Sequence, residues 1–477
     1  MLLSELLKRT EHTLIGGDVE VKSLQYNSRK VEKGDVFFCI VGSLADGHAY
    51  APQAADLGAA VIVAERELPL KVTQVLVKNT RVAMAEMAAA YYGYPTEGLP
   101  VAGITGTSGK TSTTYMLKAI AEAAGKKVGL IGTIQNMIGD TALSADRTTP
   151  ESVDLQALFR RMRDENVDLA VMEVSSHSLD QHRVHGIEFD VGVFTNLSQD
   201  HLDYHKSFES YLDAKKLLFR QSKFAIVNAD DVHSAKMLEG LNIPNASFGI
   251  TERADVSASE IDITTRGVQF DMATRIGKTR INIPTPGLFS VYNAMGASAA
   301  AIELGFSLDF IKRGLERMGV VAGRLEPLPS GGRDFTVFLD YAHKPDALEN
   351  VLKTVRGFAK GRIVTLFGCG GDRDKAKRPL MGEVAGRYSD FIVVTSDNPR
   401  SEEPMSIIAA IEEGVKKTGT EYVVIENRYA AIEYALHNAR RDDVVILAGK
   451  GHESYQEISG GKHHFDEKEI VAEILSR

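Results

Sequence analysis

The segment GITGTSGKTST at residues 103–113 has the residue types of a phosphate-binding loop. It follows a short apolar run and opens a helical stretch, and its glycines let backbone N–H groups turn toward an anion. Lys110 would reach the β- and γ-phosphates of a nucleotide, and the Thr111 hydroxyl would bind Mg²⁺. Ile104 replaces the first glycine of the strict pattern, so a turn that only caps a helix is the alternative. The strand before the loop and the helix after it favour the phosphate site.

Two further polar segments begin where predicted strands end, MEVSSHSLDQHRV at residues 172–184 and TNLSQDHLDYH at residues 195–205. Glu173 and His201 are the candidate Mg²⁺ ligands in them. A phosphoryl transfer needs such metal charge to offset the charge that builds on the transferred group. Taken singly, these side chains are more often ordinary surface residues. Their shared position downstream of a phosphate loop favours a metal site.

In the last third of the sequence, four apolar runs each end in a loop rich in Gly, Asp, Asn, Arg or His. These segments are 337–343, 362–374, 391–400 and 444–453. Ligands bind at the carboxyl ends of the strands in parallel α/β sheets. We therefore expect the four loops to form one site.

The elements that position these residues indicate an α/β fold with three domains, at residues 1–98, 99–324 and 325–477. The first contains strands at 36–42 and 61–65 with a helix between them. In the second, apolar runs at 101–105, 128–133, 169–176, 190–196 and 224–229 predict a parallel sheet buried on both faces. Alternation over 256–283 predicts antiparallel strands, and a helix is expected around Tyr292–Leu304.

Composition excludes several classes of protein. The formal net charge of -9 argues against a nucleic-acid binder. Cys39 and Cys369 are far apart and form no CxxC pair, so we expect reduced thiols and neither zinc nor a disulfide. The N-terminal segment carries charges, and no apolar run approaches the ~20 residues that span a bilayer. We expect a cytoplasmic protein without a nucleic-acid or membrane partner.

The form GTSGKT, with its glycine at Gly106, resembles the ATP loop of the Mur ligases and the related folylpolyglutamate synthetases. EVSSH, DHLDYH and DNPR are also similar to Mur ligase segments, and the resemblance covers essentially the whole chain in order. It implies a small N-terminal α/β UDP-binding domain, a central P-loop-type parallel-sheet ATPase domain and a C-terminal Rossmann-like α/β domain.

The resemblance also implies a modified lysine. In the family, a lysine in an AK pair is carbamylated by CO₂ and holds a second Mg²⁺, and here the pair is Ala214–Lys215. Lys216 is adjacent and could be confused with it. Without the resemblance, Lys215 would be interpreted as a solvated helix lysine. The implied metal ligands are Thr111, Glu173, His201 and N6-carboxylated Lys215.

The ATP site implied by the resemblance extends beyond the loop. Asn293 would contact the adenine, Arg324 the phosphates, and Asp340 and His343 the ribose and nucleotide edge, although His343 could also be an ordinary surface or core histidine. The implied ATP-binding residues are Gly106, Thr107, Ser108, Gly109, Lys110, Thr111, Ser112, Asn293, Arg324, Asp340 and His343. The implied catalytic residues are Lys110, Lys215, Arg324 and His201.

The first two domains would hold a UDP-linked muropeptide. Arg183 suits this role because a guanidinium can hold a carboxylate still for activation. Arg147 stands where the family often has Asn, which puts that contact in doubt. The implied muropeptide-binding residues are Tyr26, Ser28, Ser43, Leu44, Ala45, Thr148, Thr149, Ser175, Gln181 and Arg183.

The DNPR motif is linked in this family to meso-diaminopimelate. Diaminopimelate differs from lysine chiefly by a distal carboxylate, which an arginine fork binds with two hydrogen bonds. Asp397 and Glu453 could bind the distal ammonium. The alternative is a proline-containing turn with a surface arginine. The implied residues are Arg373, Asp397, Asn398, Pro399, Arg400, Gly449 and Glu453.

Together these features imply a monomeric, ATP- and Mg²⁺-dependent ligase that joins meso-diaminopimelate to UDP-N-acetylmuramoyl-L-alanyl-D-glutamate through an acyl phosphate. The loops of the three domains would meet around a common cavity that holds ATP, the acid and the diamino acid. Two alternatives stay open: an L-lysine-adding ligase of the same family, and a nucleotide-binding regulator without turnover.

Overall fold

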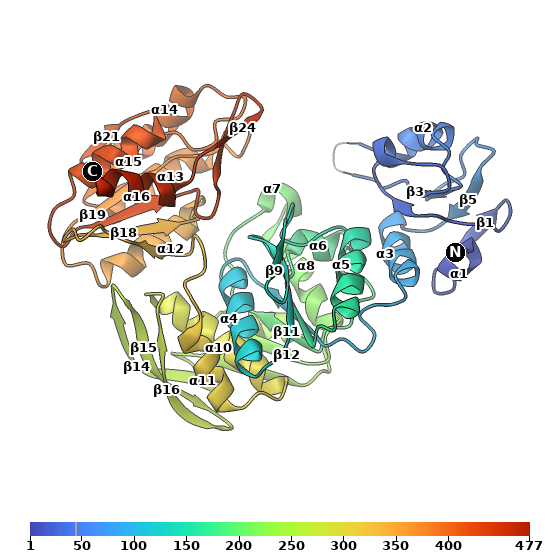
Figure 1. Cartoon of the computed structure of the whole chain (residues 1–477), viewed down its shortest axis with the longest axis horizontal. Helices are drawn as coiled ribbons and strands as arrows, with labels where there is room; N and C mark the ends of the chain where they lie inside the picture. Colours follow the sequence, from blue (N-terminus) through green and yellow to red (C-terminus); the bar gives the residue numbers. More distant parts are fainter. Residues whose placement is uncertain (43–44) are drawn as a thin grey trace. The chain divides into compact units, whose positions relative to one another are not determined.

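The N-terminal sheet has the strand order β1-β5-β4-β3-β2, with β1 antiparallel to β5 and the other pairs parallel (Figure 1). The computed structural model describes residues 1–42 and 45–477. The strands are β1 Thr13–Ile15, β2 Leu24–Gln25, β3 Val36–Phe38, β4 Val61–Ala64 and β5 Thr73–Leu76. The helices are α1 Leu3–Leu6, η1 Ser28–Lys30, η2 Gly47–Tyr50, α2 Ala51–Asp56 and α3 Thr80–Tyr91. The two predicted strands and the helix between them are confirmed.

Contacts between Cα atoms divide the chain into two units, and each is described by itself. Unit 1 comprises Met1–Val256 and Gly296–Ile311, and unit 2 comprises Ser257–Met295 and Lys312–Arg477. The domain boundaries expected near residues 98 and 324 stay predictions.

The central sheet of unit 1 has the order β13-β12-β11-β6-β10-β7-β8-β9. From β13 to β7 the pairs are parallel, and β8 and β9 are antiparallel additions that the sequence analysis did not predict. The strands are β6 Val101–Thr105, β7 Val128–Ile131, β8 Asn136–Ile138, β9 Thr141–Leu143, β10 Leu169–Glu173, β11 Val191–Phe194, β12 Ala225–Asn228 and β13 Asn245–Gly249. The five predicted parallel strands are confirmed, and each is buried along its length.

Helices connect these strands and cover the sheet, as parallel order requires. They are α4 Lys110–Ala123, α5 Ser152–Asp164, α6 Ser176–Asp180, α7 Leu202–His205, α8 Phe208–Arg220 and α9 Ser234–Leu238. Two later helices, α10 Leu288–Glu303 and α11 Leu308–Arg317, have residues in both units. The predicted helix around Tyr292–Leu304 corresponds to α10.

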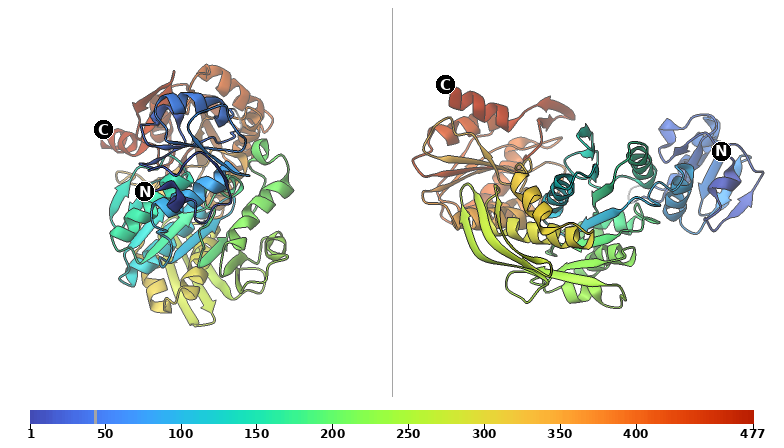
Figure 2. Two further views of the ribbon diagram at one scale, coloured as in Figure 1. Left: turned by 90° about the vertical axis from the view of Figure 1, so that its right-hand side faces the viewer. Right: turned by 60° about the horizontal axis from the view of Figure 1, so that its bottom comes forward.

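The alternating segment forms an antiparallel meander, as predicted. Its strands are β14 Val256–Thr264, β15 Gly267–Thr274 and β16 Gly277–Ile283, coloured yellow-green in Figure 2. Tight turns join them, and Gly267 and Gly277 start their strands with φ of 143° and 138°.

The C-terminal sheet of unit 2 has the order β17-β18-β22-β19-β20-β21, in which only β17 runs antiparallel to its neighbour. The strands are β17 Glu326–Leu328, β18 Thr336–Asp340, β19 Ile363–Phe367, β20 Phe391–Val394, β21 Tyr422–Val424 and β22 Val444–Ala448, and the separate hairpin is β23 Tyr455–Ile458 with β24 Gly461–His464. The helices are α12 Pro345–Arg356, α13 Lys377–Tyr388, α14 Pro404–Val415, α15 Arg428–His437 and α16 Glu467–Ser476. Because β18, β19, β20 and β22 are parallel, their four polar loops leave the same edge of the sheet, as predicted.

Both cysteines are buried free thiols, in agreement with the expected reduced side chains. In the part of the chain that the structure describes, no helix combines the length and the apolar character needed to cross a membrane.

Candidate functional site

The predicted phosphate loop connects β6 to α4 and closely approaches the loop after β11. Gly106 has φ of 147°, and a Cβ there would lie 1.9 Å from Thr195 Oγ1, so the position requires glycine. Thr107 and Ser108 donate their backbone N–H groups to Asn196, at 2.9 Å to its carbonyl and 3.0 Å to its side-chain oxygen. Gly109, with φ of 86°, then starts α4. The loop conformation is thus fixed by a neighbouring strand end.

Two lysines donate to the same carbonyl of this loop. The ammonium of Lys110 lies 2.8 Å from the Gly106 oxygen, and that of Lys215, from α8, lies 2.9 Å from it. Lys215 is 1% exposed, so the alternative of a solvated helix lysine is wrong. Lys216 is only partly buried. Burial and contact with the loop both distinguish Lys215 as the lysine of interest.

Glu173 ends β10 and lies beside the start of α4. Its carboxylate accepts hydrogen bonds from the Thr111 hydroxyl at 3.0 Å and from the Thr133 N–H and hydroxyl at 2.8 and 3.0 Å. The side chain is buried, with 1% exposure. Two predicted metal ligands, Thr111 and Glu173, are therefore in direct contact.

His201 lies at the start of α7 with a left-handed φ of 53°, and its ring centroid is 6.2 Å from that of Tyr211. Tyr211 lies 3.0 Å from the Thr107 hydroxyl through its phenol oxygen, and its ring is 4.6 Å from the Lys215 ammonium. It thereby contacts the phosphate loop and lies near both residues. The sequence analysis missed Tyr211, although its place four residues before Lys215 puts both on one helix face.

The donor set fits Mg²⁺ only if a further oxygen ligand is supplied. No group of three or more His, Cys, Asp or Glu side chains suited to a metal occurs among the described residues. Mg²⁺ is commonly held by one or two carboxylates together with phosphates and water. Glu173 and Thr111 supply such oxygens, and a carbamate on Lys215 would add another anionic one.

The predicted muropeptide residues before α5 and after β10 form a connected group. Thr149 donates to the Glu173 carbonyl at 2.9 Å, and Ser175 donates its N–H to the Thr149 hydroxyl at 3.2 Å. Arg183 donates to the Thr149 carbonyl at 3.0 Å and to the Gln181 side-chain oxygen at 2.7 Å. The Thr148 and Thr133 hydroxyls, 3.0 Å apart, connect this group to Glu173.

A carboxylate that the sequence analysis did not single out lies among three arginines in this group. Glu151, 5% exposed, forms ion pairs with Arg147 at 2.6 Å, Arg183 at 3.1 Å and Arg81 at 3.2 Å. Three guanidinium groups share one carboxylate, which leaves an excess of positive charge. Arg147, whose contact was in doubt, belongs to this cluster.

The N-terminal muropeptide residues are less closely connected. Tyr26 donates its phenol hydrogen to Asp154 at 2.5 Å, and burial with this carboxylate raises the pKa of Tyr26 above its usual value. Ser28 begins η1 and is half-buried, and Ala45 is exposed. Ser43 and Leu44 lie outside the described residues.

Among the predicted nucleotide residues of unit 2, Asp340 ends β18 and is 5% exposed. It accepts hydrogen bonds from the Leu325 and Ala342 N–H groups at 2.7 and 2.8 Å. Burial raises the pKa of Asp340 to about 6, opposed by the nearby charge of Arg324. The Arg324 guanidinium lies over the Tyr341 ring, 5.4 Å from its centroid.

His343 is half-buried, and Asn293 is buried. The His343 ring lies 2.8 Å from the Tyr341 carbonyl, and burial, with nearby Lys344 and Lys377, lowers its pKa to about 4. Its imidazole is therefore neutral near pH 7. Asn293 is 5% exposed on α10.

Three residues join the loops after β20 and β22. The Asn398 amide donates to Glu453 at 2.8 Å, and the Lys450 ammonium donates to Asn398 Oδ1 at 3.0 Å and lies 3.4 Å from Glu453. Lys450 is completely buried. Two residues predicted to bind the amino acid, Asn398 and Glu453, are thus in contact, and Lys450 was not predicted.

Arg400 has φ of 54° and is held by the hairpin β23–β24. Its backbone N–H donates to the Glu457 carbonyl at 3.0 Å, its Nε donates to the Glu457 carboxylate at 2.9 Å, and its Nη1 donates to the Gly371 carbonyl at 2.7 Å. The sequence analysis missed this hairpin. The Gly460–Gly461 pair between two short segments is a turn signal that could have revealed it.

Asp397 completes this edge. A Cβ at Gly449, where φ is 113°, would lie 2.7 Å from Asp397 Oδ2, so the carboxylate passes close to bare backbone. Oδ2 is buried and has no hydrogen-bond partner within the described part of the chain. Pro399 is buried, and Arg373 is exposed on the loop after β19.

A buried ion pair lies next to the loops that follow β20 and β22. Arg428 and Glu467, at 0% and 1% side-chain exposure, lie 2.8 Å apart at the starts of α15 and α16. Arg428 also donates to the carbonyls of Ser396 and Ala448, at 3.3 and 2.9 Å. It thereby connects the ends of β20 and β22.

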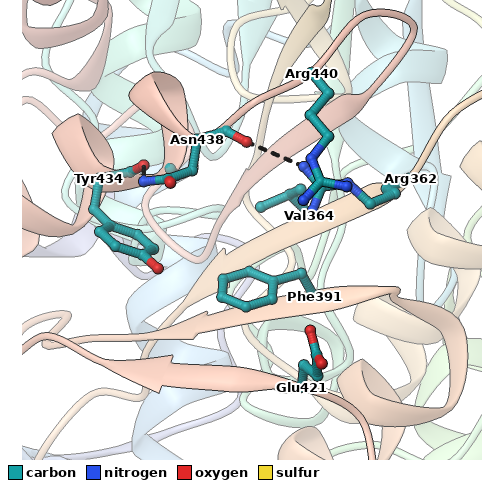
Figure 3. Close-up of a pocket in the computed structure, with 8 residues that line it drawn as sticks. Arg362, Val364, Phe391, Glu421, Tyr434, Asn438 and Arg440 are labelled. Atoms are coloured by element: carbon teal, nitrogen blue, oxygen red, sulfur yellow. Dashed lines mark hydrogen bonds between the residues drawn. The ribbon is translucent and has the colours of Figure 1, made fainter.

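A separate cavity of unit 2 lies at the opposite edge of its sheet (Figure 3). Several of its lining residues lie near the amino ends of β19, β20 and β21. One lining residue, Arg362, donates to the Asn438 carbonyl at 3.1 Å. Ligand sites of parallel sheets lie at the carboxyl ends, so this cavity is not part of the predicted site. That residues of both units share one cavity stays a prediction.

Comparison with protein families gives three matches in order along the chain. Residues 20–92 match the model described as Mur ligase family, catalytic domain. Residues 104–301 match the Mur ligase middle domain, and residues 323–451 match the Mur ligase, glutamate ligase domain.

Relatives extend over the whole length. A protein of Caldanaerobacter subterraneus subsp. tengcongensis named UDP-N-acetylmuramoyl-L-alanyl-D-glutamate--2,6-diaminopimelate ligase is 51% identical, with 100% of this chain and 99% of the relative covered. Ligase 1 of that name from Clostridium acetobutylicum is 48% identical at the same coverage. A solved structure of such a ligase gives a TM-score of 0.70 at 30% identity, covering 97% of each chain. MurF ligase from Thermotoga maritima, solved in complex with ADP, gives 0.64 at 18% identity, with 95% and 97% covered, and shares the fold.

Proposed function

Because this chain belongs to the Mur ligase family, we propose that it adds meso-diaminopimelate to the D-glutamate of UDP-N-acetylmuramoyl-L-alanyl-D-glutamate in peptidoglycan synthesis, with ATP as co-substrate. The predicted family, fold class and ligase activity are confirmed by the full-length relatives. The choice of diaminopimelate is supported by two contacts at one edge of the sheet. Asn398 donates to Glu453, and Arg400 is held by Glu457.

The proposed reaction has two steps. The D-glutamate carboxylate attacks the γ-phosphorus of ATP, which gives an acyl phosphate and releases ADP. The amine of diaminopimelate then attacks the acyl carbon, and the tetrahedral intermediate expels phosphate to leave the amide. Negative charge builds on the phosphoryl oxygens, so the ammonium of Lys110 and the guanidinium of Arg324 are proposed to stabilise it.

Thr111, Glu173, His201 and carbamylated Lys215 are proposed to hold Mg²⁺. When bound, the metal would offset the phosphate charge during transfer. The hydrogen bond between Thr111 and Glu173 and the burial of Lys215 beside the loop support this assignment. In the uncarbamylated form, Lys215 adds a second ammonium at the Gly106 carbonyl instead.

The muropeptide is proposed to bind along Thr148, Thr149, Ser175, Gln181 and Arg183. The excess positive charge around Glu151 supports this, because the substrate carries carboxylates and a diphosphate. Tyr26, Ser28 and Ala45, with Ser43 and Leu44, are proposed for the UDP part, and Asn293, Asp340 and His343 for the adenosine part of ATP.

Selection of the amino acid is proposed to depend on Arg400 and Asp397. Glu457 and Gly371 hold the Arg400 guanidinium, which would receive the distal carboxylate of diaminopimelate. The unpartnered Oδ2 of Asp397 suits the distal ammonium, because a buried carboxylate oxygen is costly without a donor. Arg373, Pro399 and Gly449 are proposed to complete this site. We further propose that the protein acts in the cytoplasm as a monomer.

The test is a substrate panel with ATP and Mg²⁺ that measures phosphate release and the amide product. Release should require both the muropeptide and diaminopimelate. Equal or better use of L-lysine would establish the lysine-adding alternative. Phosphate release with neither substrate would indicate a plain ATPase, and none with both would indicate a nucleotide-binding regulator.

A further inference from the structure

Lys450 is a buried cation that none of the predicted roles uses. It follows β22, is 0% exposed, and its ammonium contacts Asn398 Oδ1 at 3.0 Å and Glu453 Oε2 at 3.4 Å. A lysine is almost never fully buried unless it is paired, because its charge loses hydration. Its retention among polar loops therefore points to a role in the site.

The contacts of Lys450 fix the orientation of Asn398. The amide oxygen of Asn398 accepts from Lys450 and from the Glu457 N–H at 3.0 Å, and its NH₂ group donates to Glu453 at 2.8 Å. The opposite amide orientation would set NH₂ against two donors. Lys450 thereby holds both Asn398 and Glu453, which are proposed to bind the amino acid.

Ion pairs neutralise two of the arginines at this edge. Arg428 cancels Glu467, and Arg400 cancels Glu457, each through an ion pair of 2.8 or 2.9 Å. Lys450 lies 3.4 Å from the carboxylate of Glu453, and Asp397 supplies a second buried carboxylate at this edge.

A site that holds both cations and carboxylates suits a zwitterionic group, such as the distal aminocarboxylate of diaminopimelate. Without the charge of Lys450, the Glu453 carboxylate would lose this cationic partner. Such a site suits a lone ammonium, which is the distal group of lysine.

We propose that Lys450 is a positioning residue that sets the preference for an amino acid with a zwitterionic end over one with a cationic end. This inference rests on the proposed function and deepens it. Lys450 acts through Asn398 and Glu453 and through the charge balance, without direct contact with the reacting atoms.

The experiment uses the full chain with two substitutions. Lys450→Gln keeps a donor for Asn398 and removes the charge, whereas Lys450→Met removes both. For each variant kcat and KM are measured with diaminopimelate and with L-lysine, and KM is measured for ATP. Lys416→Gln is the matched control, because Lys416 is 61% exposed and its ion pair with Glu412 lies at the surface.

In both Lys450 variants, the ratio of kcat/KM for lysine to kcat/KM for diaminopimelate should rise about tenfold or more, as expected for one uncompensated charge near the ligand. KM for ATP should not change in either Lys450 variant, and the Lys416→Gln control should keep the wild-type ratio. An unchanged ratio, with both amino acids affected equally, would overturn the proposal and leave a structural role. So would failure of both variants to fold.

The measurements on the wild type distinguish a failure of this inference from a failure of the proposed function. If the wild type ligates neither amino acid, or prefers lysine, the proposed function fails. If the wild type prefers diaminopimelate and the variants keep that preference, only the role of Lys450 is wrong.

Discussion

Glu151 in unit 1 and Lys450 in unit 2 are each a buried charge with several polar partners, but their surroundings differ in net charge. Glu151 meets three arginines, so cations are in excess. Lys450 lies in a cluster that holds both cations and carboxylates. The first environment suits an anionic substrate and the second a zwitterion. The comparison teaches that the charge balance of a whole cluster, more than the presence of an arginine, indicates the kind of ligand.

The largest expected effect concerns the cation of the phosphate loop. Lys110→Ala should lower kcat by about a thousandfold or more, because the transferred phosphoryl group loses a charge partner. Thermal melting should stay near that of the wild type. Lys126→Ala, at an exposed surface pair with Asp168, is the control. An active Lys110→Ala variant would show that the charge of Lys110 is not needed at the transferred phosphoryl group.

The second prediction concerns the buried carboxylate of Asp340 in unit 2. Because burial raises the pKa of Asp340 to about 6, the folded chain binds this proton more tightly than the unfolded chain, whose value is near 3.8. The wild type should therefore lose stability, relative to Asp340→Asn, as pH rises from about 4 to about 6. The difference should reach up to about 3 kcal/mol. Denaturant unfolding at several pH values tests this, and parallel pH profiles would contradict it.

The third prediction concerns Arg400, in the cluster of cations and carboxylates of unit 2. Arg400→Lys should raise KM for diaminopimelate by about tenfold or more, because an ammonium cannot reproduce the two-pronged contact of a guanidinium with a carboxylate. KM for ATP should stay constant. Arg387→Lys, an exposed arginine paired with Glu383 on α13, is the control. An unchanged KM for diaminopimelate would show that Arg400 does not bind its carboxylate.

The smallest effect is expected at the rim of the cationic cluster. Arg147→Asn removes one of the three guanidinium groups around Glu151 and should raise KM for the muropeptide about threefold, with kcat nearly unchanged. The effect is small because the Arg147 side chain is 53% exposed, and it should shrink further in high salt. Arg160→Asn on α5 is the control. A lower KM would show that the excess charge does not serve the substrate.

The parallel sheets and the phosphate loop could be predicted because their signals are local. Continuous apolar runs, such as 169–173, identify strands buried on both faces, and GTSGKT combines glycines with a cation over six residues. Thr111 and Glu173 were both predicted as metal ligands, and the structure places them in contact.

The two charge clusters could not be predicted in this way. Arg81 and Glu151 are 70 residues apart, and nothing local connects them. Lys450 stands between two glycines in a polar loop, where a lysine is ordinarily exposed, so its burial depends on tertiary packing. The hairpin that holds Arg400 has short, largely polar strands without an apolar alternation.

The ion pair of Arg428 and Glu467 has a consequence for engineering of the C-terminus. Glu467 is the first residue of α16, and its partner bridges the loops that follow β20 and β22. Deleting α16 would leave the buried guanidinium of Arg428 without its counter-ion, next to the loops after β20 and β22. A purification tag should therefore be appended after Arg477, and truncation should stop short of α16.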